Sequence, residues 1–205
     1  MLREVLVKHN IVQDTVVLLN DEMKKGKRVL VEDCSSTQMD VDLGIYPYTD
    51  SFYTTTGAVC TGLGVPEESL ETTIGALSAV TLLNDSFHKR IKQFPTEIFE
   101  DTDKAAFNSI QEKLRTRYKI EDMIFGWPDL NLVKHAERIN RLSSLFITHI
   151  DLFDDLDEIK VCTGYERKYM DNGVEKIVQG RGRLPARVGE FGAWDAVYTT
   201  LPGWK

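Results

Sequence analysis

The sequence predicts an α/β fold, a mostly parallel sheet flanked by helices, with a small antiparallel hairpin near residues 166–177. Helical patterns alternate with short β-branched apolar runs along the chain, an order typical of a parallel sheet. Asp171-Asn172-Gly173 indicates the hairpin, because an Asn-Gly pair readily takes the positive φ values that tight turns require. The 205 residues suffice for one core, so we expect a single domain over 1–205.

The N-terminal third is expected to contain helix, one strand and one long loop. Residues 2–26 show helical spacing, with Asp14 able to cap a second helical run and Gly26 able to end it. The β-prone run 29–31 predicts a buried strand. The stretch after it, up to Gly64, is rich in Ser, Thr, Asp and Gly and predicts a functional loop.

The later elements follow in order. Residues 70–83 are either helix or strand, because apolar residues at helical spacing are mixed there with good strand formers. The remaining elements are predicted as helix 103–118, helix 130–142, strand 144–150, an acidic helical turn at 154–157 and strand 159–164.

The composition is that of a globular protein with an acidic balance. The chain is 42% hydrophobic and carries a formal net charge of −7. This charge argues against a nucleic-acid-binding protein, because phosphate backbones select basic surfaces. No apolar run approaches the roughly twenty residues that span a bilayer, and no signal peptide is recognisable. We therefore expect a cytoplasmic protein without a membrane partner.

The cysteines and histidines predict neither a disulfide framework nor a metal site. Cys34, Cys60 and Cys162 are odd in number and widely spaced, which suits free thiols. None of the four histidines is followed three or four residues later by a metal-ligand residue. The sequence therefore assigns no metal ligand and no catalytic residue.

One stretch, residues 28–64, resembles the corresponding stretch of adenylosuccinate synthetases. The likeness continues in one order over nearly the whole chain, through Phe94-Pro95-Thr96-Glu97, Gly126-Trp127, Thr148-His149-Ile150-Asp151, Glu158-Ile159-Lys160-Val161 and Leu201-Pro202-Gly203-Trp204. The resemblance implies a dimeric ligase of AMP synthesis that joins IMP to L-aspartate with GTP and Mg²⁺. The family's N-terminal phosphate loop and catalytic residues have no counterpart here, so we expect a partial copy that is inactive alone.

By this resemblance, Thr148, His149 and Asp151 stand where the family binds guanine. The family pattern is Thr-Lys-x-Asp, in which the carboxylate accepts two N–H bonds from the base. Here the aspartate is retained and His149 replaces the lysine, and an imidazole can still stack on a purine. The alternative is that Asp151 only caps the turn that follows it.

The resemblance also implies an IMP pocket, in which this chain departs from the family. Ser35 replaces the family's Gln or Asn, and Asp50 replaces the Thr that binds phosphate. Thr49 takes that place if the register slips by one residue. A carboxylate beside a phosphate repels it by about 1–4 kcal/mol per charge pair.

The implied aspartate site has changed its charge as well. The family holds L-aspartate with an arginine-rich loop ahead of a Gly-Trp pair, because carboxylates favour bidentate guanidinium partners. Glu121 and Asp122 occupy that loop here. Arg115 and Arg117 lie a few residues upstream and are the stand-ins if a small insertion shifts the loop.

Two functions from different classes remain open. One is a synthetase-like chain that acts only when an N-terminal half is supplied. The other is a non-catalytic relative, a pseudoenzyme that binds or regulates a full-length synthetase. An unrelated α/β domain is a third reading. An assay of adenylosuccinate formation separates the first two.

Overall fold

The structure is a computed structural model that describes residues 2–9, 11–32, 35–84, 95–99, 101–121, 123–180 and 192–204. Its helices are α1 (Leu2–Lys8), α2 (Thr15–Lys24), α3 (Thr56–Leu63), α5 (Lys104–Arg117) and α6 (Leu130–Asn140), with 3₁₀ turns η1 (Thr37–Met39), η2 (Glu67–Ser69) and η3 (Ile150–Phe153). Its strands are β1 (Ile74–Ser78), β2 (Thr81–Asn84), β3 (Met123–Gly126), β4 (Ser144–Thr148), β5 (Glu158–Asp171), β6 (Val174–Gly180) and β7 (Asp195–Pro202).

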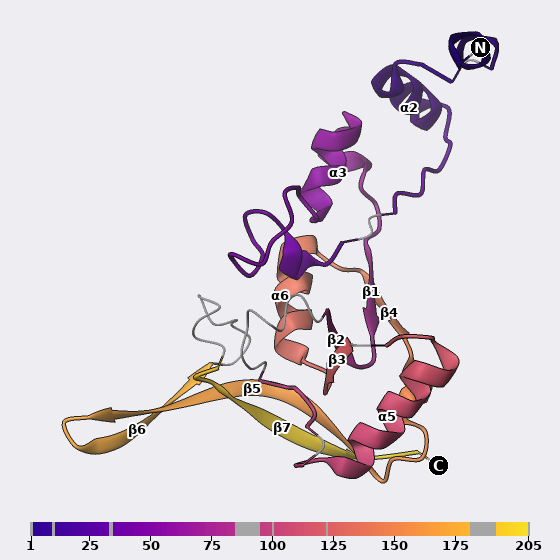
Figure 1. Ribbon diagram of the computed structural model, residues 1–205. Helices are drawn as coiled ribbons and strands as arrows, with labels where there is room; N and C mark the ends of the chain where they lie inside the picture. Colours follow the sequence, from indigo (N-terminus) through magenta and orange to yellow (C-terminus); the bar gives the residue numbers. More distant parts are fainter. Residues whose placement is uncertain are drawn as a thin grey trace.

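The described strands form three small sheets (Figure 1). β1 pairs with β4 in parallel, β2 pairs with β3 antiparallel, and β5 lies between β6 and β7 in an antiparallel sheet. The α/β class is confirmed, while parallel pairing among the described strands is limited to β1 and β4. Parallel strands need a long crossover connection, and the chain between β1 and β4, which includes α5 and α6, is long enough to provide one.

The predicted hairpin is confirmed, and its first strand is longer than expected. Asn172 and Gly173 have φ values of 51° and 79°, and Asp171 pairs with Val174 across the turn. The predicted strand 159–164 and the first arm of the hairpin form the single strand β5. Figure 1 shows the tip of this hairpin projecting away from the rest of the molecule.

The N-terminal helical stretch is divided into two helices. Asp14 caps α2 as predicted, since its side chain accepts the backbone N–H of Val17 at 3.1 Å. Gly26 ends the stretch with a φ of 80°. For residues 70–83 the strand alternative is correct, since this segment contains β1 and the first part of β2. The buried residues Ala79 and Val80 lie between the two strands.

The predicted strand at 29–31 is wrong. Residues 27–32 have no regular secondary structure, and Val29, Leu30 and Val31 are 43%, 93% and 41% exposed. A strand needs a neighbouring strand for its backbone hydrogen bonds, and no described strand pairs with this run. The acidic turn predicted at 154–157 is also misplaced, because the helical turn is η3, which ends at Phe153.

The main core lies between α5, β3 and η3. Ala106, Ile110 and Leu114 of α5 are buried, whereas Ala105 is exposed. The fully buried members from the other elements include Leu152 of η3. Burying such a side chain contributes about 1.5–3 kcal/mol, so this cluster fixes α5 against η3.

A buried lysine adds a polar tie between the same two elements. Lys113 of α5 is 8% exposed, and its Nζ donates to the carbonyl oxygens of Leu152, at 3.4 Å, and Asp154. Its Nζ also lies 3.5 Å from the carboxylate of Asp155. The last turn of α5 is thereby held beside η3.

Buried polar groups fix both ends of α6. At its start, Asp129 accepts the backbone N–H of Asn131 at 2.9 Å and the hydroxyl hydrogen of Tyr165 from β5. Burial raises the pKa of Asp129. At the other end, the side chain of Asn140 accepts the backbone N–H of Thr56 and donates to the hydroxyl of Thr37, each at 2.9 Å. Helix α6 thus connects β5 to the long loop.

Candidate functional site

A polar cluster lies where the parallel strands β1 and β4 end. β4 ends at Thr148, His149 follows with a left-handed backbone (φ 58°), and Asp151 lies in η3. In open α/β sheets, ligands bind beyond the carboxyl ends of the strands. The three predicted guanine-site residues are therefore together at a position suited to a ligand.

His149 is held between β1 and the end of α5. Its Nδ1 lies 3.0 Å from the hydroxyl oxygen of Thr148 and 3.1 Å from that of Ser78, the last residue of β1. Tyr118, which follows α5, packs edge-on against the imidazole with ring centroids 4.5 Å apart. These contacts fix the imidazole at the strand ends.

Two side chains from the end of α5 already bind the carboxylate of Asp151. Arg117 Nη1 donates to Oδ2 at 2.7 Å, and the hydroxyl of Tyr118 donates to Oδ1. The side chain of Asp151 is 33% exposed, so solvent and ligands still reach it. We call Asp151, Arg117 and Tyr118 the Asp151 clamp.

The clamp fixes the protonation of its members. The hydrogen bond from Tyr118, with a further contribution from Arg117, lowers the pKa of Asp151. The same hydrogen bond raises the pKa of the Tyr118 phenol. At neutral pH Asp151 is therefore ionised and Tyr118 protonated. An ionised carboxylate has about four lone-pair positions, so it can accept further N–H bonds from a ligand.

The long loop after α2 is organised by a buried carboxylate. Asp40 is fully buried and accepts the backbone N–H groups of Asp42, Leu43 and Thr54 at 3.0, 2.9 and 2.8 Å. Burial by itself would raise the pKa of Asp40, but these backbone donors outweigh it and lower the pKa. The ionised side chain therefore ties residues 40–43 to Thr54 within this loop.

The three predicted IMP-pocket positions lie together in that loop. The hydroxyl of Ser35 donates to Asp50 Oδ2 at 3.2 Å, and Thr49 is half-buried next to Asp50. A phosphate bound at Ser35 would therefore meet the carboxylate of Asp50, and the two charges would repel each other. The roles of these residues stay predictions.

The two candidate arginines contact different carboxylates. Arg115 Nη2 lies 2.9 Å from Glu112 on the same helix, whereas Arg117 belongs to the Asp151 clamp. Glu121 is exposed after the end of α5, and Asp122 lies outside the described residues. The assignment of these four residues to an aspartate-binding loop stays a prediction, because these contacts do not test it.

Sequence reasoning missed three residues that shape this site. Tyr118 and Ser78 contact residues 33 and 71 positions away in the chain, so no local pattern indicates them. Nothing in the local sequence distinguishes Asp40 from the other acidic residues of its loop. A buried Asp that caps several backbone N–H groups leaves only a weak signal in a loop rich in Asp, Thr and Gly.

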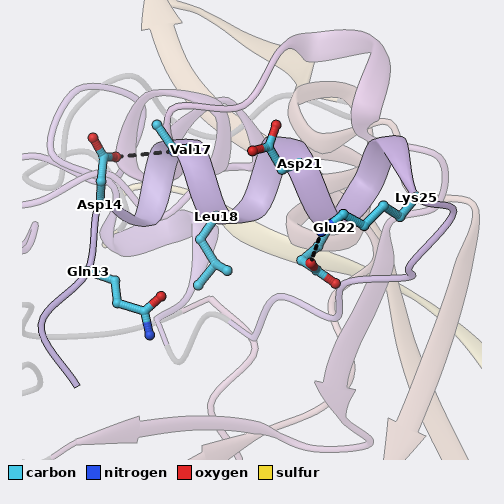
Figure 2. Close-up of a pocket in the computed structure, with 7 residues that line it drawn as sticks. All are labelled: Gln13, Asp14, Val17, Leu18, Asp21, Glu22 and Lys25. Atoms are coloured by element: carbon cyan, nitrogen blue, oxygen red, sulfur yellow. Dashed lines mark hydrogen bonds and ion pairs between the residues drawn. The ribbon is translucent and has the colours of Figure 1, made fainter. Parts of the chain in front are cut away.

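Two shallow grooves lie outside this cluster, and neither contains a predicted site residue. The groove along α2 is shown in Figure 2 and is lined by Gln13, Asp14, Val17, Leu18, Asp21, Glu22 and Lys25. The other lies on the hairpin sheet and is lined by Arg167, Tyr169, Val178 and Trp194. Among the described residues, no group of three or more His, Cys, Asp or Glu side chains could hold a metal ion. None of the described helices is both long and apolar enough to cross a bilayer.

Comparison with known proteins gives one consistent result. The family model described as adenylosuccinate synthetase matches residues 2–205. The adenylosuccinate synthetase of Paramecium tetraurelia is 34% identical over 205 residues, which are 99% of this chain and 43% of the relative. That of Ligilactobacillus salivarius is 36% identical over 196 residues, covering 95% of this chain and 41% of the relative. The chain thus spans less than half the length of these relatives.

A solved structure supports the fold independently. The fully ligated adenylosuccinate synthetase from Plasmodium falciparum matches with a TM-score of 0.76 and 22% identity. The match covers 98% of this chain and 46% of that protein. At this identity the likeness concerns the fold alone.

Proposed function

Because this chain belongs to the adenylosuccinate synthetase family, we propose that it supplies the guanine-binding part of a synthetase fold in purine nucleotide synthesis. The full reaction joins IMP to L-aspartate at the expense of GTP. In this proposal, Thr148, His149 and Asp151 hold the guanine base of GTP. The observation that carries this proposal is the gathering of these side chains at the carboxyl ends of β1 and β4.

The chemistry of the carboxylate sets the preference for guanine. Guanine presents two neighbouring N–H donors on the edge that faces a carboxylate, whereas adenine presents an acceptor beside its amino group. Asp151 is ionised and partly exposed, and each of its oxygens already accepts one hydrogen bond and can accept another. The clamp therefore permits guanine selectivity but weakens affinity, because Arg117 competes for the carboxylate.

Calorimetric titration with GTP and ATP tests this assignment. The isolated chain should release more heat with GTP than with ATP, and Asp151→Asn should remove the preference because its amide replaces an acceptor by a donor. Arg117→Ala should strengthen GTP binding. Arg115→Ala is the matched control, because Arg115 pairs with Glu112 on its own helix and its loss should change neither titration. The absence of heat with either nucleotide, or equal heat with both, would refute the assignment.

The second candidate, a non-catalytic partner of a full-length synthetase, rests on the charges of the other two pockets. Asp50 binds Ser35 where the family places a phosphate, and Glu121 lies where the family places an arginine. Mg²⁺ has no cluster of ligands among the described residues. If the chain is a regulatory partner, adding it to an active synthetase should change the rate of that enzyme. If the chain is instead the guanine-binding part of a synthetase fold, the rate should stay unchanged.

A further inference from the structure

The β1·β4 pair exposes apolar side chains on both of its faces. Ile74 is 62% exposed, and Leu145, Phe146 and Ile147 are 45%, 63% and 50% exposed. Successive residues of a strand point to opposite faces, so Phe146 lies on one face and its two neighbours lie on the other. We call these four residues the β1·β4 surface.

The edges of this pair are open as well. Among the described strands, β1 pairs only with β4 and β4 only with β1, which leaves hydrogen-bonding groups along both outer edges. Parallel sheets occur almost only where both faces are covered, and two-stranded sheets are marginal by themselves. A pair with this exposure has the character of the inner strands of a larger sheet.

The comparisons indicate what covers the pair. The fold matches the Plasmodium falciparum synthetase over 98% of this chain, with a TM-score of 0.76, but spans only 46% of that protein. The Paramecium relative is likewise matched over 43% of its length. More than half of the family's fold therefore lies outside this sequence. Residues 29–31 resemble the β1·β4 pair in this respect, because they are exposed and β-prone and have no strand partner among the described strands.

We infer that the β1·β4 surface, together with residues 29–31, docks the polypeptide that supplies the part of the adenylosuccinate synthetase fold that this chain does not span. That polypeptide adds strands to the open edges and apolar cover to the faces. The inference follows from family membership and from the exposed strands. It does not depend on nucleotide binding at Asp151, so either proposal can fail without the other.

The inference is tested with a chimera in which this chain replaces the matched portion of the Paramecium tetraurelia synthetase. Phe146→Asp is introduced into the chimera and into the isolated chain. It should lower the unfolding midpoint of the chimera by about 5 °C or more, because it buries a charge, and leave the isolated chain nearly unchanged. Backbone amides of β1 and β4 should exchange at least about tenfold more slowly in the chimera. Val174→Asp at the hairpin tip is the matched control, since Val174 is 62% exposed but belongs to a fully paired hairpin turn, and it should affect neither protein.

A second arrangement covers the case in which the chimera does not fold. The chain is then coexpressed with the unmatched portion of the same synthetase, each with its own tag. The wild-type and Val174→Asp chains should copurify with that portion, and the Phe146→Asp chain should not. Equal effects of Phe146→Asp in chain and chimera, copurification that ignores this substitution, or a homodimer of the isolated chain that Phe146→Asp dissociates would each overturn the inference.

Discussion

Tyr165→Phe should destabilise the protein far more than an equivalent change on the same sheet. Tyr165 is 1% exposed and its hydroxyl donates to Asp129, which is 3% exposed. Removing a partner from a buried polar group costs about 1–3 kcal/mol, so we expect a loss of that size at pH 7. Tyr198→Phe is the control, because its hydroxyl makes only a long bond of 3.4 Å to the neutral carbonyl of Pro95. That change should cost less than about 1 kcal/mol.

The pH dependence of this loss provides a stricter test. Burial raises the pKa of Asp129 above its ordinary 3.8, so the contribution of Asp129 to stability is full below pH 3.8 and is lost as the pH rises through the folded pKa. The hydrogen bond from Tyr165 opposes this rise, and removing it raises the folded pKa further. Urea unfolding from pH 4 to 8 should therefore show a smaller cost of Tyr165→Phe at pH 4. A cost that is independent of pH, or equal to that of Tyr198→Phe, would refute this reasoning.

Three further predictions concern other parts of the site. Asn140→Ala should cost about 1–3 kcal/mol in urea unfolding, because it leaves the backbone N–H of Thr56 without its acceptor; an unchanged midpoint would contradict the role of α6. The phenol of Tyr118 should titrate above its ordinary pKa of 10.0 by ultraviolet absorbance, and Asp151→Asn should lower that pKa; identical titrations would exclude the clamp. Gly126→Ala should destabilise the fold, measured by its thermal midpoint, since an added Cβ would lie 2.5 Å from a backbone carbonyl oxygen; a midpoint within error of wild type would show that the backbone yields there.

Local chemistry explains the parts of the fold that the sequence predicts well. The Asn172-Gly173 turn, the Asp14 cap and the amphipathic helix over 103–118 each depend on residues within a few positions of one another. Such features need no tertiary information. The resemblance to a family is also readable, because its motifs recur in the same order along the chain.

The errors arise where the outcome depends on distant partners. Residues 29–31 have strand propensity but no strand beside them among the described residues, and propensity alone does not form a strand. The Asp151 clamp joins residues 34 positions apart, and the sequence places Arg117 only near a hypothetical aspartate loop. The exposure of Phe146 in an apolar run is likewise set by tertiary packing rather than by the run itself.

Adenylosuccinate formation is the most direct test of the claim that this chain carries part of a synthetase fold without performing the reaction alone. The isolated chain is incubated with IMP, GTP, Mg²⁺ and L-aspartate, and the Paramecium tetraurelia enzyme serves as the positive control. We predict product from the control and no product above background from the chain. Turnover by the isolated chain, lost on Asp151→Asn, would contradict the account.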